Sequence, residues 1–166
     1  MMANRNINDV PLVSLEQIKN ISFSSFKYNK YFNKICSLIP NKEFERLEIK
    51  NLTNNDKNLV YCFVIKDKIL KIGSTSRSIT DRISSYNCGK EAYRKKGTCS
   101  TTNYFVLQTL LNINEEIDVY AFFTEKIVID VFGDLKEIKI PSKTYEKKIL
   151  RDLKINDELP SFCQQT

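Results

Sequence analysis

Residues 59–73 read LVYCFVIKDKILKIG, and this stretch decides the fold. Residues 59–65 form a continuous apolar run, which is typical of a strand covered on both faces. The polar break at residues 66–68 separates this run from a second apolar segment, ILKIG, at residues 69–73. The pattern therefore predicts an antiparallel β-hairpin.

The register of this hairpin determines which side chains share a face. A three-residue turn that pairs Ile65 with Ile69 places Phe63 opposite Lys71. Tyr61 and Lys71 then lie on one face as diagonal neighbours, about 5.5–8 Å apart at the backbone. A two-residue turn would place these two side chains on opposite faces.

After the hairpin, helix and strand patterns alternate along the chain. Helices are predicted at residues 76–86, at residues 103–111 and from Ser142 to about residue 154, and strands at residues 117–123, 126–132 and 136–140. This order predicts an α/β (α+β) fold, with a small mixed or antiparallel sheet flanked by helices.

Before the hairpin, the sequence favours short helices. Ser14 and Gln17 resemble a capping box, and an aromatic-rich segment that runs to about Leu38 fits a further helix. The polar stretch at residues 51–58 indicates a boundary. We therefore expect a helical extension packed on a core that carries one basic insertion, at residues 1–56, 57–166 and 87–102 respectively.

The composition limits the classes of function. The 166 residues are 42% hydrophobic and 28% charged, which is typical of one globular domain, and 26 Lys+Arg against 20 Asp+Glu give a net charge of +6. This charge suggests a polyanionic partner. The absence of histidine excludes HNH-type nucleases, Ser-His-Asp hydrolases and His-based zinc sites.

Cysteine usage and hydropathy indicate where the protein acts. The five cysteines form no CxxC pair, which fits reduced thiols rather than a disulfide framework or a zinc cluster. No apolar run approaches the roughly 20 residues that span a bilayer, and the first residues lack an apolar signal core. We therefore expect a cytoplasmic protein without membrane attachment.

Three ionisable residues interrupt the apolar pattern of the core. Lys71 lies in the second strand, and Arg82 lies on the apolar stripe formed by Ile79 and Tyr86. Glu146 precedes apolar residues at +3, +4 and +7. Each alone also fits a side chain that reaches water or pairs at the edge of the core. Because burying unpaired charges costs several kcal/mol each, all three together indicate a shared polar cleft.

The hairpin resembles a known nuclease motif. LVY at residues 59–61 and KIG at residues 71–73 resemble the paired tripeptides that name the GIY-YIG nuclease superfamily. Arg82 and Glu146 match its catalytic Arg and its metal-binding Glu in order and spacing. Three further segments resemble those of the small dimeric Type II restriction endonucleases of this superfamily: SYNCGK at residues 85–90, YRK at residues 93–95 and GTCSTTNYFVLQ at residues 97–108. These enzymes also have Lys in place of the second Tyr of the superfamily name.

The resemblance implies a role for each of these residues. Tyr61 orients or deprotonates the attacking water, and Lys71 lowers the pKa of this phenol. Arg82 and Tyr86 stabilise the charge on the phosphate. Glu146 binds one Mg²⁺ ion per active site.

The same resemblance implies the partners. The protein is expected to be a homodimer in a bacterial cytoplasm that cuts double-stranded DNA at a short site, leaving 5′-phosphate and 3′-hydroxyl ends. A DNA methyltransferase of the same specificity is expected to protect the host genome.

The basic insertion and the C-terminal tail are expected to contact DNA. The insertion carries a cluster of cations that suits the phosphate backbone, namely Lys90, Arg94, Lys95 and Lys96. Polar groups that suit base recognition are Ser100 and Thr101 of the insertion, and Gln164 and Gln165 of the tail.

Two other interpretations stay open. Asp130 followed by Glu137-Ile138-Lys139 resembles the D…ExK site of PD-(D/E)xK nucleases, and Glu48-Ile49-Lys50 is a second ExK sequence. A non-catalytic DNA-binding regulator would explain the charge and the basic insertion. It would not explain why Tyr61, Lys71, Arg82 and Glu146 occur together.

Overall fold

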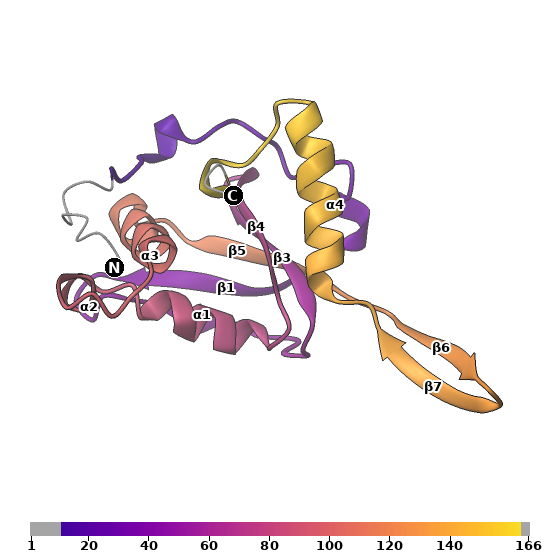
Figure 1. Ribbon diagram of the computed structural model, residues 1–166. Helices are drawn as coiled ribbons and strands as arrows, with labels where there is room; N and C mark the ends of the chain where they lie inside the picture. The colour runs from indigo at the N-terminus through magenta and orange to yellow at the C-terminus, as the bar shows by residue number, and fades with distance from the viewer. Residues whose placement is uncertain (1–10, 164–166) are drawn as a thin grey trace.

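Figure 1 shows the computed structural model, which describes residues 11–163. Its elements are η2 (Leu15–Gln17), η3 (Asn29–Tyr31), β1 (Asn33–Asn41), β2 (Arg46–Lys50), β3 (Leu59–Ile65), β4 (Lys68–Thr75), α1 (Ile79–Asn87), α2 (Glu91–Lys95), α3 (Thr101–Ile113), β5 (Ile117–Phe123), β6 (Lys126–Val131), β7 (Asp134–Lys139), α4 (Ser142–Ile155) and η4 (Ser161–Cys163). The predicted fold class is confirmed.

A five-stranded antiparallel sheet organises the molecule, with the order β2-β1-β5-β3-β4. The predicted hairpin forms its β3–β4 edge, and β3 is buried along its whole length. The predicted three-residue turn is wrong, because Ile65 pairs with Lys68 across a two-residue turn. Lys66 and Asp67 both have positive φ, as a type I′ turn requires.

A β-bulge restores the predicted pairing further along the hairpin. Val64 pairs with Ile69, whereas Phe63 pairs with Lys71, so Leu70 is the extra residue of the bulge. The inserted residue reverses the effect of the shorter turn. Lys71 therefore lies opposite Phe63, as expected.

The sheet has a separate core on each face. Helices α1 and α3 cover one face, where Ile83 and Leu107 pack with Phe63. Helix α4 and the aromatic N-terminal segment cover the other face, where Ile149 packs with Val60. The odd residues of β3 face the first core and its even residues the second, which explains the continuous apolar run.

The expected N-terminal helical extension is wrong in its secondary structure. The capping box at Ser14 forms, with Gln17 Oε1 accepting from the Ser14 amide at 2.8 Å, but it starts only the short η2. The segment before Leu38 is strand β1, which pairs with β5. Pairing with a strand about eighty residues away decides this conformation. Pro40 is tolerated because β1 contacts β5 only as far as Leu38.

A second, two-stranded sheet projects from the body as the hairpin β6–β7 (Figure 1). Asn58 binds both of its roots: its Nδ2 donates to Thr124 Oγ1 and, at 3.0 Å, to the Ile140 carbonyl. Its Oδ1 accepts from the Ser142 amide at 2.9 Å. One side chain thus joins the start of β3, both ends of the hairpin and the start of α4. Between residues 11 and 163, no helix is long and apolar enough to cross a membrane.

Candidate active site

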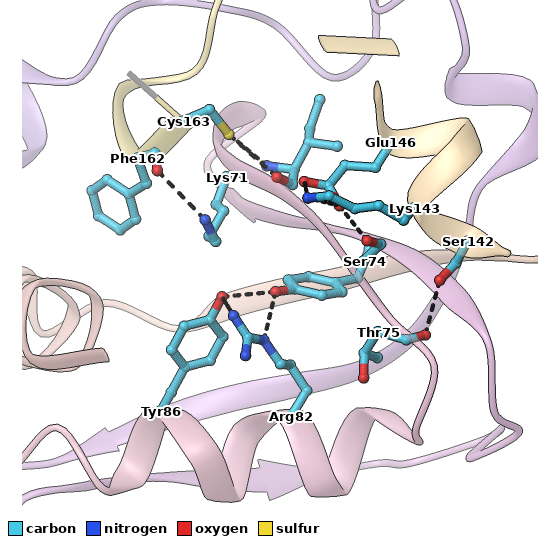
Figure 2. A network of polar contacts seen from close by, with 12 residues as sticks. Lys71, Ser74, Thr75, Arg82, Tyr86, Ser142, Lys143, Glu146, Phe162 and Cys163 are labelled. Atoms are coloured by element: carbon cyan, nitrogen blue, oxygen red, sulfur yellow. Dashed lines mark hydrogen bonds and ion pairs between the residues drawn. The ribbon is translucent and has the colours of Figure 1, made fainter. Parts of the chain in front are cut away.

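Strand β3 and helix α1 bring three polar side chains into contact. Tyr61 lies on β3, and Arg82 and Tyr86 lie one turn apart on α1. The two phenol oxygens are 2.7 Å apart. Arg82 donates from Nε to the Tyr61 hydroxyl and from Nη2 to the Tyr86 hydroxyl, each at 3.0 Å (Figure 2). One guanidinium therefore holds both phenols through its fork of donors.

This cluster is neutral phenols around a fixed positive charge. Neither Tyr61 nor Tyr86 has exposed surface. Burial raises the pKa of Tyr61, and the charge of Arg82 opposes this rise. Burial also raises the pKa of Tyr86. Burial alone would lower the pKa of Arg82, but the two phenols raise it, so the guanidinium stays charged. Such an arrangement suits a phosphate or a developing phenolate.

Lys71 is buried beside this cluster and contacts the C-terminal segment. Its Nζ donates to the Phe162 carbonyl at 3.4 Å, and burial lowers the pKa of its ammonium. Lys71 was expected to lower the pKa of Tyr61. In the structure, Arg82 has this role. It donates a hydrogen bond to the phenol, and among the charged groups it does most to oppose the rise in pKa that burial causes.

Gly73 makes room for the ring of Tyr61. The two residues are paired across β3 and β4. A Cβ atom at Gly73 would lie 2.5 Å from Tyr61 Cζ, closer than real side chains approach. The glycine of KIG is therefore required by close approach, and its absent side chain fixes where the phenol lies.

Glu146 approaches the cluster from α4 and is only 5% exposed. Its carboxylate accepts from the Ser74 hydroxyl and, at 3.0 Å to both oxygens, from Lys143 Nζ (Figure 2). Figure 2 shows Glu146 and Lys71 in the same region as Arg82 and Tyr86, and the negative charge of Glu146 raises the pKa of Lys71 against the effect of burial. All five predicted catalytic residues thus gather in one region.

The donors at Glu146 fit a hard divalent cation. Within the described part of the chain, no three Asp, Glu or Cys side chains form a group that could hold a metal ion. A single carboxylate is enough for Mg²⁺, which keeps several water ligands. The Lys143 ammonium against both carboxylate oxygens shows that this position attracts positive charge. The Lys143 side chain is 59% exposed, so it can leave.

The predicted DNA-binding residues of the insertion lie away from this cluster. The insertion forms α2 at the far end of α1 from α4 (Figure 1). Part of its charge is engaged: Lys90 donates to the Phe44 carbonyl at 3.2 Å, and Lys95 pairs with Glu91 at 3.3 Å. Arg94 lies over the Tyr104 ring.

The remaining residues of this set differ in their surroundings. Lys96 is exposed at the end of α2. Ser100 caps α3 by accepting from the Asn103 amide at 3.1 Å, and Thr101 is the first residue of that helix. Gln164 and Gln165 lie outside the described residues.

Sequence reasoning missed two partners of Glu146. Lys143 lies one turn before it on the same helix, so the i,i+3 spacing could have identified it. Ser74 directly follows KIG, but it is 72 residues from Glu146. Only the packing of α4 against β4 brings these two together.

Comparison with solved structures identifies the class. No protein-family model and no curated protein sequence matches the chain. Restriction endonuclease HPY188I in complex with product DNA is 44% identical, with a TM-score of 0.71, over 100% of this chain and 99% of that one. A mutant of bacteriophage T4 EndoII is 20% identical, with a TM-score of 0.55, over 84% of this chain and 98% of that one, and supports the fold alone.

The full-length likeness and the polar cluster define the chain as a nuclease. The chain belongs to the family of restriction endonuclease HPY188I. This is a family of sequence-specific deoxyribonucleases.

Proposed function

We propose that this protein is a Type II restriction endonuclease of the GIY-YIG superfamily. It binds double-stranded DNA and hydrolyses phosphodiester bonds at a short specific site, leaving 5′-phosphate and 3′-hydroxyl ends. The observation that carries the proposal is the hydrogen-bonded cluster of Tyr61, Arg82 and Tyr86 beside the buried carboxylate of Glu146.

The side chains of the cluster divide the work of phosphodiester hydrolysis. The charge of Arg82 favours the phenolate form of Tyr61, which orients the attacking water, accepts its proton and becomes the neutral phenol. Arg82 also stabilises the negative charge that grows on the phosphate, and Tyr86 donates to the same group. Because Tyr61 and Tyr86 are covered, the side chains around them must shift when DNA binds.

Glu146 holds one divalent cation, for which we propose Mg²⁺. Ser74 donates to the carboxylate and so fixes its orientation. The cation supplies Lewis-acid neutralisation of charge on the phosphate. Lys143 gives up its contact with Glu146 when the site is loaded.

The position of the ExK sequence disfavours a PD-(D/E)xK enzyme. Glu137 lies on the projecting strand β7, where its side chain is 62% exposed and pairs with Lys126. Asp130 accepts from the Gly133 amide at 2.6 Å within the hairpin turn. These groups serve the hairpin, and no buried carboxylate of the described chain lies near them.

A homodimer is part of the proposal, because cutting both strands of a duplex at one site takes two active sites. A DNA methyltransferase of the same specificity would protect the host DNA in the cytoplasm. The tail residues Gln164 and Gln165 remain proposed readers of base sequence.

Plasmid cleavage with and without Mg²⁺ tests the proposed function. Tyr61→Phe, Arg82→Ala and Glu146→Ala are each expected to lower cleavage by about a thousandfold or more, because each removes a group that acts in the transition state. Far-UV circular dichroism checks the fold, and DNA binding without divalent cations checks that substrate is still bound.

Glu137→Ala is the matched control. We expect this variant to cleave like the wild type. Full activity of Glu146→Ala together with loss of activity in Glu137→Ala would replace the GIY-YIG assignment by the PD-(D/E)xK one. Binding of DNA without any cleavage by the wild type would favour a regulator.

A further inference from the structure

A surface groove of about 380 Å³ runs along α4 from the candidate metal ligand. Its lining comes almost entirely from this helix: Lys143, Glu146, Lys147, Leu150, Arg151, Lys154 and, from the segment after α4, Leu159. Three exposed cations follow the carboxylate along it, at positions 147, 151 and 154. Spacings of four and three residues place them on one side of the helix. We call Lys147, Arg151 and Lys154 the α4 row.

The α4 row carries positive charge that residues 11–163 do not neutralise with an ion pair. In the described part of the chain, none of its three members lies within 4.0 Å of a carboxylate, whereas Lys143 pairs with Glu146. Glu146 is the only acidic residue of the groove lining. Three cations with one orientation therefore face solvent beside the proposed cutting site.

The other flank of the same helix differs. Lys148 pairs with Asp152 at 3.2 Å, and Lys27 of the N-terminal segment approaches the same carboxylate at 3.8 Å. Asp152 also accepts from the Tyr28 hydroxyl. Both cations on this flank thus share a carboxylate partner. The cations without a carboxylate partner are therefore concentrated on the flank that adjoins Glu146.

Length and chemistry identify the ligand. Residues 143 to 154 span about 16 Å at 1.5 Å per residue. This equals about four to five nucleotide steps of one DNA strand at 3.4 Å each. Leu150 and Leu159 are half-buried in the groove and offer apolar contact to the sugars between phosphates. An extended polyanion that starts at Glu146 fits this surface.

We propose that the α4 row binds the phosphate backbone of the strand being cut, on one side of the scissile phosphate. This inference rests on the proposed function and names the surface that holds its substrate. It places the main electrostatic contact next to the active site. The insertion at residues 87–102 has part of its charge engaged by Phe44 and Glu91 and contributes less.

The test is DNA binding by a triple variant, Lys147→Gln, Arg151→Gln and Lys154→Gln, measured without divalent cations over a range of salt concentrations. Each phosphate contact contributes about 0.9 to the slope of log K against log salt. We expect the slope to fall by about two to three, and the dissociation constant at low salt to rise by tenfold or more. Gln keeps the helix propensity, so circular dichroism and Tm should match the wild type.

Lys148→Gln is the matched control, because it removes a cation of the same helix that Asp152 already neutralises. It should leave both the slope and the affinity unchanged. Uncharged methylphosphonate linkages on one side of the cut should weaken DNA binding by the wild type strongly and DNA binding by the triple variant only a little. A duplex with the same linkages on the opposite side of the cut serves as the reference.

An unchanged salt slope in a folded triple variant would overturn the inference. An equal loss of DNA affinity and salt slope in Lys148→Gln would overturn it too, because the loss would then reflect only the change in net charge. These outcomes leave the proposed function intact as long as the wild type cleaves DNA. A wild type that neither binds nor cleaves DNA would instead defeat the proposed function itself.

Discussion

Tyr61 is a phenol that the fold keeps out of water and beside a guanidinium. Burial raises its pKa and Arg82 opposes the rise, so the balance between them sets how readily it takes a proton. This balance is a property of three side chains, and changing one of them should be visible in a pH profile.

Arg82→Lys should move the rising limb of the pH–rate profile of cleavage to higher pH. The shorter ammonium loses the bond to the Tyr61 hydroxyl, which raises the pKa of Tyr61 further. A base with a higher pKa is deprotonated only at higher pH. Residual cleavage measured between about pH 7 and 11 checks the shift, because this range brackets the ordinary tyrosine pKa of about 10.

Lys71→Met is the comparison for this measurement. Lys71 donates to the Phe162 carbonyl, and the charge beside the phenol is that of Arg82. We expect its rising limb to stay where the wild type has it, even if the rate falls. A shift in Lys71→Met with none in Arg82→Lys would restore the role that sequence reasoning assigned to Lys71.

Gly73→Ala should remove activity by displacing the phenol. The new Cβ would lie 2.5 Å from Tyr61 Cζ, so the ring must move or the strands must separate. Overpacking of this kind costs about 1–3 kcal/mol in stability. Cleavage rate and Tm are the measurements. A variant with both at wild-type values would show that the ring position has no role.

At the scale of elements, Asn58 joins parts of the chain that are distant in sequence. It bonds to Thr124 and Ile140 at the two roots of the projecting hairpin, and to Ser142 at the start of α4. It also has a positive φ of 65°, which Asn tolerates better than most residues. Its amide therefore sets where α4 begins.

Asn58→Ala should lower the free energy of unfolding by about 2–3 kcal/mol, because partners that are partly buried lose their bonds and Ala disfavours positive φ. Asn112→Ala, at an exposed position on α3, is the control and should be close to neutral. Urea denaturation measures both variants. Equal stability of the two would mean that water replaces the Asn58 amide without cost.

Most elements from β3 onward could be predicted because their signals are local, whereas the short helices α2 and η4 were not predicted. The apolar run of β3 and the stripe of Ile79, Ile83 and Tyr86 on α1 are visible in short windows. Strand β1 could not, since its pairing with β5 is decided by a segment far along the chain. The turn of the hairpin was mispredicted, and the bulge at Leu70 compensated for the error.

The same distinction holds for the site. Arg82 and Tyr86 share one helix, so their spacing alone brings them together. Ser74 meets Glu146 across 72 residues, and Lys71 meets the Phe162 carbonyl across 91. Contacts of this range depend on how α4 and the C-terminal segment pack. Sequence patterns predict which residues are polar in the core, and only the fold decides their partners.

At the scale of the whole molecule, burial of weak acids makes stability depend on alkaline pH. Burial raises the pKa of seven thiols and phenols, with Cys36 shifted to about 11: Cys36, Tyr61, Cys62, Tyr86, Cys99, Tyr104 and Cys163. Above the pKa values of the unfolded chain, about 8.5 for Cys and 10 for Tyr, only the unfolded state ionises. Their contribution is fully present below that range and is lost as pH rises.

Lys71 acts in the opposite direction. Burial lowers its pKa, so the folded state releases this proton first and folding gains as pH rises toward the unfolded value. This one group offsets only part of the stability that the seven thiols and phenols lose at high pH. With no histidine in the chain, no imidazole titrates near neutrality.

Thermal unfolding should therefore show a nearly constant Tm between about pH 6 and 8 and a falling Tm above about pH 9, the range in which thiols and then phenols ionise. Circular dichroism melts in a series of buffers at constant ionic strength measure this. A steep change of Tm between pH 6 and 8 would contradict the expectation and would point to a carboxylate with a strongly raised pKa.

The projecting hairpin has a mechanical consequence for the enzyme. Phe132 at its tip is fully exposed, so a partner that binds there exerts force on the hairpin far from the body of the protein. The hairpin joins the five-stranded sheet at Asn58, which donates hydrogen bonds to Thr124 and Ile140. A load on the arm meets these bonds before it reaches α4 and Glu146. We therefore expect changes in the hairpin beyond these bonds to leave the position of Glu146 unchanged.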